Sequence, residues 1–173
     1  MMDLDDFKEI NDEYGHEMGD RILIEVAQRI RALIRSSDVL IRWGGDEFLI
    51  VSPDSTRAGA AGFALRILNA FAKPIETDSV PISLNISIGW AAFPWFPEDP
   101  DRVPVEAVLG LADRALYEAK EGGKNRVVGP GPRTDGKSFD VAAGSNPVPA
   151  YSVETICQPR PPQMRASGKA VML

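Results

Sequence analysis

The chain has 173 residues, a formal net charge of −6 at pH 7 and 44% hydrophobic residues. This composition indicates a soluble protein with one domain and an appendage, and its acidity argues against a nucleic-acid-binding protein. It contains no apolar run long enough to cross a membrane, and its acidic amino terminus lacks the pattern of a secretion signal. The single cysteine, Cys157, cannot form an internal disulfide, which is typical of a cytoplasmic protein.

The first half of the chain predicts a strand, two helices and a hairpin. Residues 1–4 have the pattern of a strand end, and apolar residues at helical spacing over residues 7–14 predict a short helix. Asp20 is predicted to cap a second helix. Two apolar stretches, residues 39–43 and 48–51, flank the letters GGDE. They predict a β-hairpin around a glycine-rich turn.

The second half predicts two further helices and two strands. Ser55 or Thr56 is predicted to cap the first helix. Apolar and polar residues alternate over residues 82–88, which predicts a strand with one buried face. A helix over residues 105–121 is expected to end at a pair of glycines, and a last strand covers residues 126–128. This order predicts an α/β (α+β) sandwich with a central, mostly antiparallel sheet flanked by helices.

The composition changes at about Gly129. Residues 130–173 hold seven of the 14 prolines and show no helical or strand periodicity over a useful length. Such a segment buries too little apolar surface to fold, so we expect a disordered tail or linker. A peptide that a partner binds is the alternative. The expected folded domain is therefore residues 1–129.

Two groups of acidic residues are candidates for a metal site. Asp3, Asp5 and Asp6 cluster at the predicted strand end, and Asp46 and Glu47 occupy the hairpin turn. Carboxylates that converge from these places would suit Mg²⁺ or Mn²⁺, which prefer hard oxygen ligands and can bridge nucleotide phosphates. A polar turn and a solvated acidic loop are the alternative for either group alone.

The hairpin turn strengthens the metal interpretation. Burial of Trp43 and Phe48 on its two sides would fix the turn, and its two adjacent acids would then repel each other unless a cation were bound. Gly44 and Gly45 remove side chains where a phosphate could approach the backbone. The turn therefore predicts a metal-assisted phosphate site.

Five separated segments resemble the GGDEF family of diguanylate cyclases. RWGGDEF at residues 42–48 contains the motif that names the family, and DLDDFKEIND, YGHEMGD, NISIGWA and ADRALYEAKEGGKNRV match family segments in order and spacing. The resemblance covers nearly all of residues 1–129 and implies the nucleotidyl-cyclase, polymerase-palm-like fold. In this family a helix and most of a central strand precede the first aspartate. The domain is therefore expected to be truncated there, with apolar surface exposed.

The resemblance assigns residues to four kinds of site. The implied metal ligands are Asp3, the Leu4 carbonyl and Asp46. The implied catalytic residues are Glu47, Asp46, Gly44 and Gly45. The implied substrate-binding residues are Asn11, Asp20, Lys8, Phe7, Leu23, Lys120 and Lys124. The residues implied to bind product at an inhibitory RxxD site are Arg35 and Asp38.

These assignments make chemical sense. Asn11 and Asp20 match guanine-reading residues, and a carboxylate accepts from the N1–H and exocyclic amine that only guanine offers, so Asp20 favours GTP over ATP. Lys124 stands where the family often has arginine, and it keeps the charge but loses the bidentate fork. Arg35 can pair with phosphate or guanine, and Asp38 with the edge of guanine. A helix-terminal arginine and a turn aspartate are the alternative.

The resemblance implies a bacterial diguanylate cyclase that condenses two GTP into cyclic di-GMP and two pyrophosphates. The 3′-hydroxyl of one GTP would attack the α-phosphorus of the other, with about two divalent metal ions per domain. Because each domain carries one reactant, an antiparallel homodimer is expected. The alternatives are a silent module that binds GTP or cyclic di-GMP, and an interaction domain without a nucleotide. No nucleic acid or membrane partner is expected.

Overall fold

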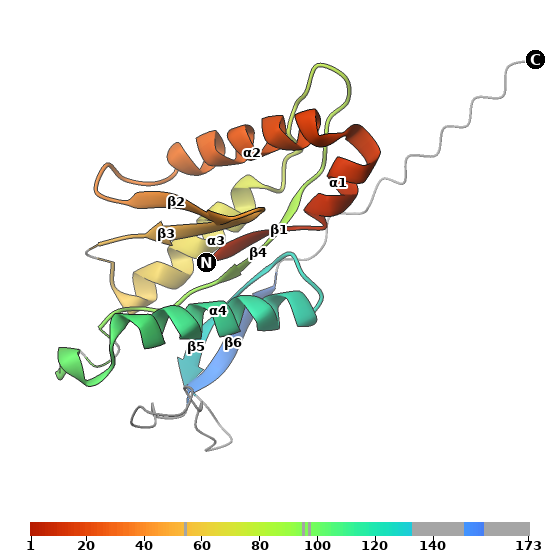
Figure 1. Ribbon diagram of the computed structural model, residues 1–173. Helices are drawn as coiled ribbons and strands as arrows, with labels where there is room; N and C mark the ends of the chain where they lie inside the picture. The colour runs from red at the N-terminus through yellow and green to blue at the C-terminus, as the bar shows by residue number, and fades with distance from the viewer. Residues whose placement is uncertain (54, 95, 97, 133–150, 158–173) are drawn as a thin grey trace, which may run out of the picture.

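A computed structural model of the chain describes residues 1–53, 55–94, 96, 98–132 and 151–157. The remaining residues, which include most of the predicted tail, lie outside this description. In chain order the elements are β1 (Met2–Asp5), α1 (Phe7–Tyr14), α2 (His16–Arg31), β2 (Val39–Gly44), β3 (Glu47–Val51), α3 (Arg57–Ala70), β4 (Asn85–Gly89), the 3₁₀ helix η1 (Pro100–Arg102), α4 (Val105–Glu121), β5 (Arg126–Pro132) and β6 (Tyr151–Cys157) (Figure 1).

The six strands form one sheet in the order β2-β3-β1-β4-β5-β6. Every neighbouring pair is antiparallel except β4 and β5, which run parallel. The prediction of a mostly antiparallel sheet with flanking helices is confirmed. β1 has four residues and lies inside the sheet, where Met2 pairs with Phe48 of β3 and Ile88 of β4 (Figure 1).

Helices cover both faces of the sheet. The main core joins the inward residues of α1, α2 and α3 to one face, where Leu4 and Ile86 are fully buried. On the other face, Ala115 and Ala119 of α4 pack against Val128 of β5. Because side chains alternate along a strand, the polar residues of β1 face α4 rather than the main core. This arrangement places carboxylates between the sheet and α4.

The strand predicted over residues 82–88 differs from the structure in burial and in extent. The strand itself is β4, Asn85–Gly89, while Ile82 forms a separate bridge with Ile75. One buried face was expected, but Ser87 is 0% exposed. The reason is that α4 lies across this face, so both faces of β4 are covered. Alternation in the sequence does not reveal a second helical layer.

Two further predictions about single residues were wrong. Asp20 does not cap α2, because the helix begins at His16 and Asp20 lies inside its second turn. Gly15, at φ +84°, makes the break that separates α1 from α2. Trp43 was expected to be buried beside Phe48, but it is 53% exposed. It lies on β2, one of the two edge strands of the sheet.

The predicted capping of α3 is confirmed at one of its two candidate residues. The Thr56 hydroxyl accepts a hydrogen bond from the N–H of Gly59, 3.1 Å away, at the start of the helix. The predicted extent of α4 is confirmed as well, since it spans Val105–Glu121 and Gly122 follows it.

The sheet also continues past residue 129, where no strand was expected. β5 extends to Pro132 and pairs with β6, Tyr151–Cys157. Val153, Thr155 and Ile156 are β-branched residues that favour extended backbone. The structure thus describes a strand at Tyr151–Cys157, within the segment expected to be a disordered tail. Disorder stays a prediction for residues 133–150 and 158–173.

An apolar cavity of about 420 Å³ lies beside the amino end of β1, between α3 and α4. Its lining includes Met1, Phe63, Trp90 and Val108. Within the described part of the chain, none of the helices has both the length and the apolar character that a membrane span requires.

Candidate functional site

The site is built around Asp3, which is 6% exposed and lies between the sheet and α4. The ammonium group of Lys120, in the last turn of α4, lies 2.6 Å from the Asp3 carboxylate. Burial raises the pKa of Asp3, and the Lys120 ion pair opposes that rise. Asp46 adds a smaller repulsion that also raises the Asp3 pKa, so the two predicted metal-binding carboxylates lie close enough to interact.

The hairpin turn meets the end of β1 through the main chain. The N–H of Leu4 donates to the carbonyl oxygen of Asp46 at 3.2 Å, and Asp3 is in register with Glu47. The antiparallel pairing of β1 with β3 therefore brings together the predicted metal ligands Asp3, Leu4 and Asp46. These residues come from two segments more than 40 positions apart in the sequence.

The donors at this place fit a hard divalent cation. Such ions prefer carboxylate oxygens, which Asp3 and Asp46 supply. A bound cation could also replace Lys120 as the partner of the buried Asp3 carboxylate. Over the described ranges, no three histidine, cysteine, aspartate or glutamate side chains form a metal-binding group. The predicted set needs only two carboxylates together with a main-chain carbonyl.

The glycines of the turn leave space beside the backbone. Neither Gly44 nor Gly45 has a positive φ, so the turn geometry does not itself demand glycine. A Cβ added at Gly45 would meet no protein atom within 4 Å. The guanidinium of Arg42 donates to the Gly45 carbonyl at 2.8 and 3.0 Å and so holds the turn. The turn therefore presents its backbone to open space, as the phosphate interpretation requires.

Two of the predicted phosphate-binding lysines already pair with carboxylates. Lys120 pairs with Asp3, and Lys124 pairs with Asp6. The Asp6 carboxylate raises the pKa of Lys124, which keeps that side chain charged. Lys8 is exposed on α1, and no ion pair to it is found among the residues that the structure describes. Two of the three lysines therefore lie at the end of β1, and the third is on α1, the helix that follows this strand.

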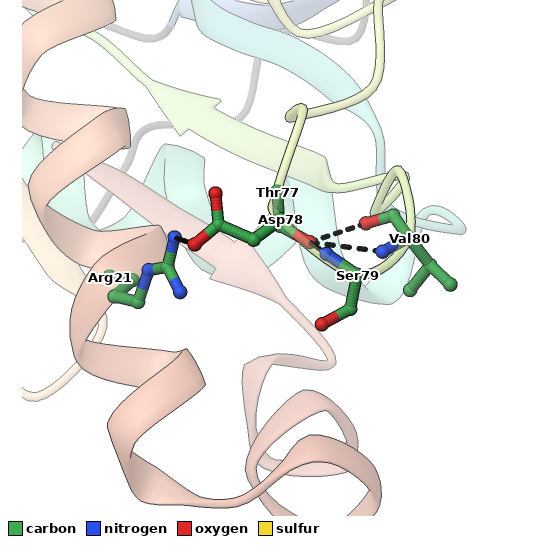
Figure 2. A network of polar contacts seen from close by, with 5 residues as sticks. All are labelled: Arg21, Thr77, Asp78, Ser79 and Val80. Carbon is green, nitrogen blue, oxygen red and sulfur yellow. Dashed lines mark hydrogen bonds and ion pairs between the residues drawn. The ribbon is translucent and has the colours of Figure 1, made fainter.

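The two predicted guanine-reading residues are brought together by α1 and α2. Gly19 precedes Asp20 on α2, and a Cβ at Gly19 would lie 1.9 Å from the side-chain oxygen of Asn11. Glycine at this position lets the two helices approach closely and places Asn11 beside the turn that carries Asp20. Arg21, the next residue, reaches from α2 to Asp78 (Figure 2). Its guanidinium lies 2.5 Å from the Asp78 carboxylate. In the loop that carries Asp78, the Thr77 hydroxyl donates to the Val80 carbonyl oxygen and accepts from the Val80 N–H (Figure 2).

Two predicted substrate-binding residues belong to the core instead. Phe7 is 7% and Leu23 is 6% exposed, and both pack in the main cluster. Their side chains support α1 and α2, the helices that carry the predicted guanine readers. A direct contact with substrate stays a prediction for these two residues.

The predicted RxxD site lies between α2 and β2. Asp38 is 6% exposed and accepts from the Arg35 N–H at 2.7 Å and from the Ser52 hydroxyl at 2.7 Å. The Arg35 hydrogen bond, with a smaller contribution from Ser52, lowers the pKa of Asp38. The Asp38 carboxylate thus closes the turn by its hydrogen bonds. The Arg35 side chain is exposed at the same turn.

Asp38→Ala is expected to lower the free energy of unfolding by about 1–2 kcal/mol at neutral pH, because two hydrogen bonds to a buried carboxylate are lost. Since the pKa of Asp38 is lowered on folding, its contribution is present above about pH 4 and is lost as the pH falls through the folded-state pKa. Urea unfolding of both proteins at several pH values tests this. If the difference in free energy of unfolding between the two proteins stays the same in acid, this prediction is wrong.

One polar cluster was not anticipated from the sequence. Asp5, on the same face as Asp3, accepts from the Ser87 hydroxyl at 2.7 Å and from the Asn125 N–H at 2.9 Å. Burial raises the pKa of Asp5, and the Asn125 hydrogen bond opposes the rise. The only signal in the sequence is the alternation of MDLD, which places two aspartates on one face of a buried strand.

Comparison with known proteins identifies relatives of this chain. The family model "Diguanylate cyclase, GGDEF domain" matches residues 1–126. The uncharacterised protein YhcK of Bacillus subtilis is 41% identical over 128 residues, which are 73% of this chain and 34% of YhcK. Diguanylate cyclase A of Treponema denticola is 38% identical over 128 residues, or 73% of this chain and 33% of that protein. The chain thus spans about a third of the length of these relatives.

A solved structure matches the fold. The GGDEF domain of the Pseudomonas aeruginosa protein YfiN superimposes with a TM-score of 0.64 and 38% sequence identity. The match covers 73% of this chain and 76% of that one.

Proposed function

This chain belongs to the GGDEF family of diguanylate cyclases, and we propose that it condenses two GTP molecules into cyclic di-GMP with release of two pyrophosphates. The observation that carries this proposal is the meeting of buried Asp3, the GGDE turn and Lys120 at the end of β1. Acidic ligands beside a cation and an open glycine turn suit a metal-bound triphosphate.

Each group at the site has a proposed role. Asn11 and Asp20 bind the guanine edge, and Asp20 rejects adenine because its carboxylate requires two donors from the base. Lys8, Lys120 and Lys124 neutralise the triphosphate. Phe7 and Leu23 support the guanine site from beneath.

Asp3, the Leu4 carbonyl and Asp46 would hold Mg²⁺ or Mn²⁺, which supplies charge neutralisation at the phosphate when bound. Asp3 releases Lys120 when its charge is taken over, so the lysine becomes available to phosphate. Glu47, beside Asp46 in the turn, is placed to bind metal or to accept the proton of the attacking 3′-hydroxyl. Gly44 and Gly45 let the backbone approach the nucleotide.

We propose an antiparallel homodimer as the active form. Each domain holds one GTP, and the 3′-hydroxyl on one side attacks the α-phosphorus on the other. Orientation of two bound substrates then supplies much of the rate enhancement. One chain alone holds half of the reacting pair, so its activity must depend on protein concentration.

Incubation with GTP and Mg²⁺ at low and high protein concentration, with detection of cyclic di-GMP by mass spectrometry, tests this function. The expected yield rises faster than linearly with protein concentration. A reaction with mixed ATP and GTP is expected to give only the guanine dinucleotide. Binding of GTP without any product would favour the alternative, a silent module that binds GTP or cyclic di-GMP, and no GTP-dependent thermal shift would contradict both.

Product inhibition through Arg35 and Asp38 is part of the proposal. Arg35→Ala is expected to leave the initial rate unchanged and to raise the inhibitory concentration of cyclic di-GMP at least about tenfold, because a charge-assisted contact is lost. Arg31→Ala, which removes an exposed arginine in the last turn of α2, is the matched control. Rates at increasing cyclic di-GMP measure the effect, and equal inhibition of both variants would rule the site out.

A further inference from the structure

Asp5 joins three segments that are distant in the sequence. It lies at the end of β1 and is 5% exposed. One carboxylate oxygen accepts from the Ser87 hydroxyl of β4, and the other accepts from the Asn125 N–H in the turn between α4 and β5. Both oxygens therefore have protein donors, whereas Asp3 on the same face is paired only with Lys120 among the described residues.

The backbone on both sides of the Asp5 contact is unusual, at the end of β1 and in the α4–β5 turn. Asp6, Lys124 and Asn125 have φ values of 58°, 61° and 48°, and they are the only non-glycine residues with positive φ in the described ranges. All three lie around the Asp5 carboxylate. A left-handed conformation costs free energy for a residue with a Cβ, so it persists only where surrounding contacts hold it.

Further contacts connect this turn to the predicted phosphate-binding lysines. The Lys124 N–H donates to the Ala119 carbonyl at 3.0 Å, which ties the turn to the last residues of α4. The Lys124 carbonyl accepts from the Arg126 side chain at 3.0 Å, and the Lys124 ammonium pairs with Asp6. The direction of the Lys124 side chain therefore depends on the left-handed pair Lys124 and Asn125.

We propose that Asp5 is a positioning residue for nucleotide binding: it holds the α4–β5 turn in its left-handed form and so directs Lys124 toward the triphosphate. This inference rests on the proposed function, in which Lys124 binds phosphate. In this proposal Asp5 contacts neither substrate nor metal, because both of its carboxylate oxygens already accept hydrogen bonds from Ser87 and Asn125. Its effect passes through one hydrogen bond, to the Asn125 N–H, rather than through its bond to Ser87.

Asp5→Asn tests this role with little change in volume. The asparagine oxygen can still accept from the Ser87 hydroxyl, but its NH₂ group cannot accept from the Asn125 N–H. The readout is the dissociation constant of 3′-deoxy-GTP with Mg²⁺, a probe that lacks the attacking hydroxyl and cannot be cyclised. Binding is expected to weaken about tenfold, because a charged hydrogen bond that supports the turn is lost.

A double-mutant cycle separates positioning from general stability. Lys124→Ala alone should weaken binding of the probe, and Asp5→Asn added to it should weaken binding by less than about twofold more. Additive effects would overturn the proposal, because Asp5 would then act without Lys124. If Asp5→Asn lowers only the melting temperature and leaves the dissociation constant of the probe unchanged, the proposal is also overturned. Asp5 would then have only a structural role.

Two further variants complete the test. Asn125→Gly in the Asp5→Asn background keeps the N–H and removes the cost of positive φ, so binding should return to within about threefold of the unmodified chain. Failure of this rescue would count against the proposal. Ser87→Ala removes the other hydrogen bond of Asp5 and should change binding by less than about twofold.

The probe also keeps this inference distinct from the proposed function. A chain that binds 3′-deoxy-GTP with the expected dependence on Asp5 but makes no cyclic di-GMP from GTP would overturn the proposed reaction and support the positioning role. If the chain makes cyclic di-GMP from GTP and Asp5→Asn does not change binding of the probe, the proposed reaction is supported and the positioning role is overturned.

Discussion

Asp46→Asn is expected to lower the rate of cyclic di-GMP synthesis about a thousandfold, with little change in melting temperature. The substitution keeps the size of the side chain but removes a negative charge from the turn that faces buried Asp3. The contacts that hold the turn use main-chain oxygens of Asp46 and Gly45, so the variant retains them. Initial rates at matched protein concentration, together with thermal unfolding, measure the two effects.

Asp101→Asn is the control for this experiment, because Asp101 is an exposed aspartate on η1, outside the candidate site. It should retain full activity. If Asp46→Asn keeps more than about a tenth of the activity, Asp46 is not required for the reaction. If instead Asp46→Asn unfolds at a much lower temperature, the turn depends on the carboxylate, and the loss of activity has a structural cause.

Gly89→Ala is expected to reduce the free energy of unfolding by about 3 kcal/mol, which is the largest effect on stability that we expect for a one-carbon change. A Cβ at Gly89 would lie 2.2 Å from both the Ala112 carbonyl oxygen and the Leu116 nitrogen of α4. These are helix backbone atoms, which cannot rotate away as a side chain can. The helix must therefore move from β4, and Lys120 at its end must move from Asp3.

Gly110→Ala is a matched control on α4 itself. A Cβ there meets nothing within 4 Å, and the position is helical, so alanine should stabilise the protein by about 0.5–1 kcal/mol. Urea unfolding of the two variants and the parent chain measures both shifts. If the two substitutions have the same sign, α4 does not pack on Gly89 as closely as the structure indicates.

The local elements were largely predictable because their signals are local. Periodic apolar residues predicted α1, a pair of glycines marked the end of α4, and apolar stretches around GGDE predicted β2 and β3. Thr56 stood where a helix cap was expected. The motif segments also gave the family, which the family model confirms over residues 1–126. Each of these features depends on residues within about one element of each other, so a single sequence contains the information.

The predictions of side-chain burial failed where burial depended on a helix covering the second face of the sheet, or on a strand lying at the edge of the sheet. Ser87 alternates with isoleucines like a solvent-facing residue, yet α4 covers it. Trp43 is as apolar as its neighbour Phe48, yet its place on the edge strand leaves it exposed. Both outcomes follow from the order of strands in the sheet and the path of α4, and residues 87 and 43 themselves contain no signal for either.

The sequence by itself determined which residues could do chemistry here: the aspartates of β1, the GGDE turn and the lysines at the end of α4. Only the tertiary structure decided their pairing. Asp3 meets Lys120 and Asp5 meets Asn125 across separations of more than 100 residues. These contacts exist because β1 lies between β3 and β4 while α4 crosses the same face. Such contacts depend on the global packing of the chain, which local propensity and spacing do not specify.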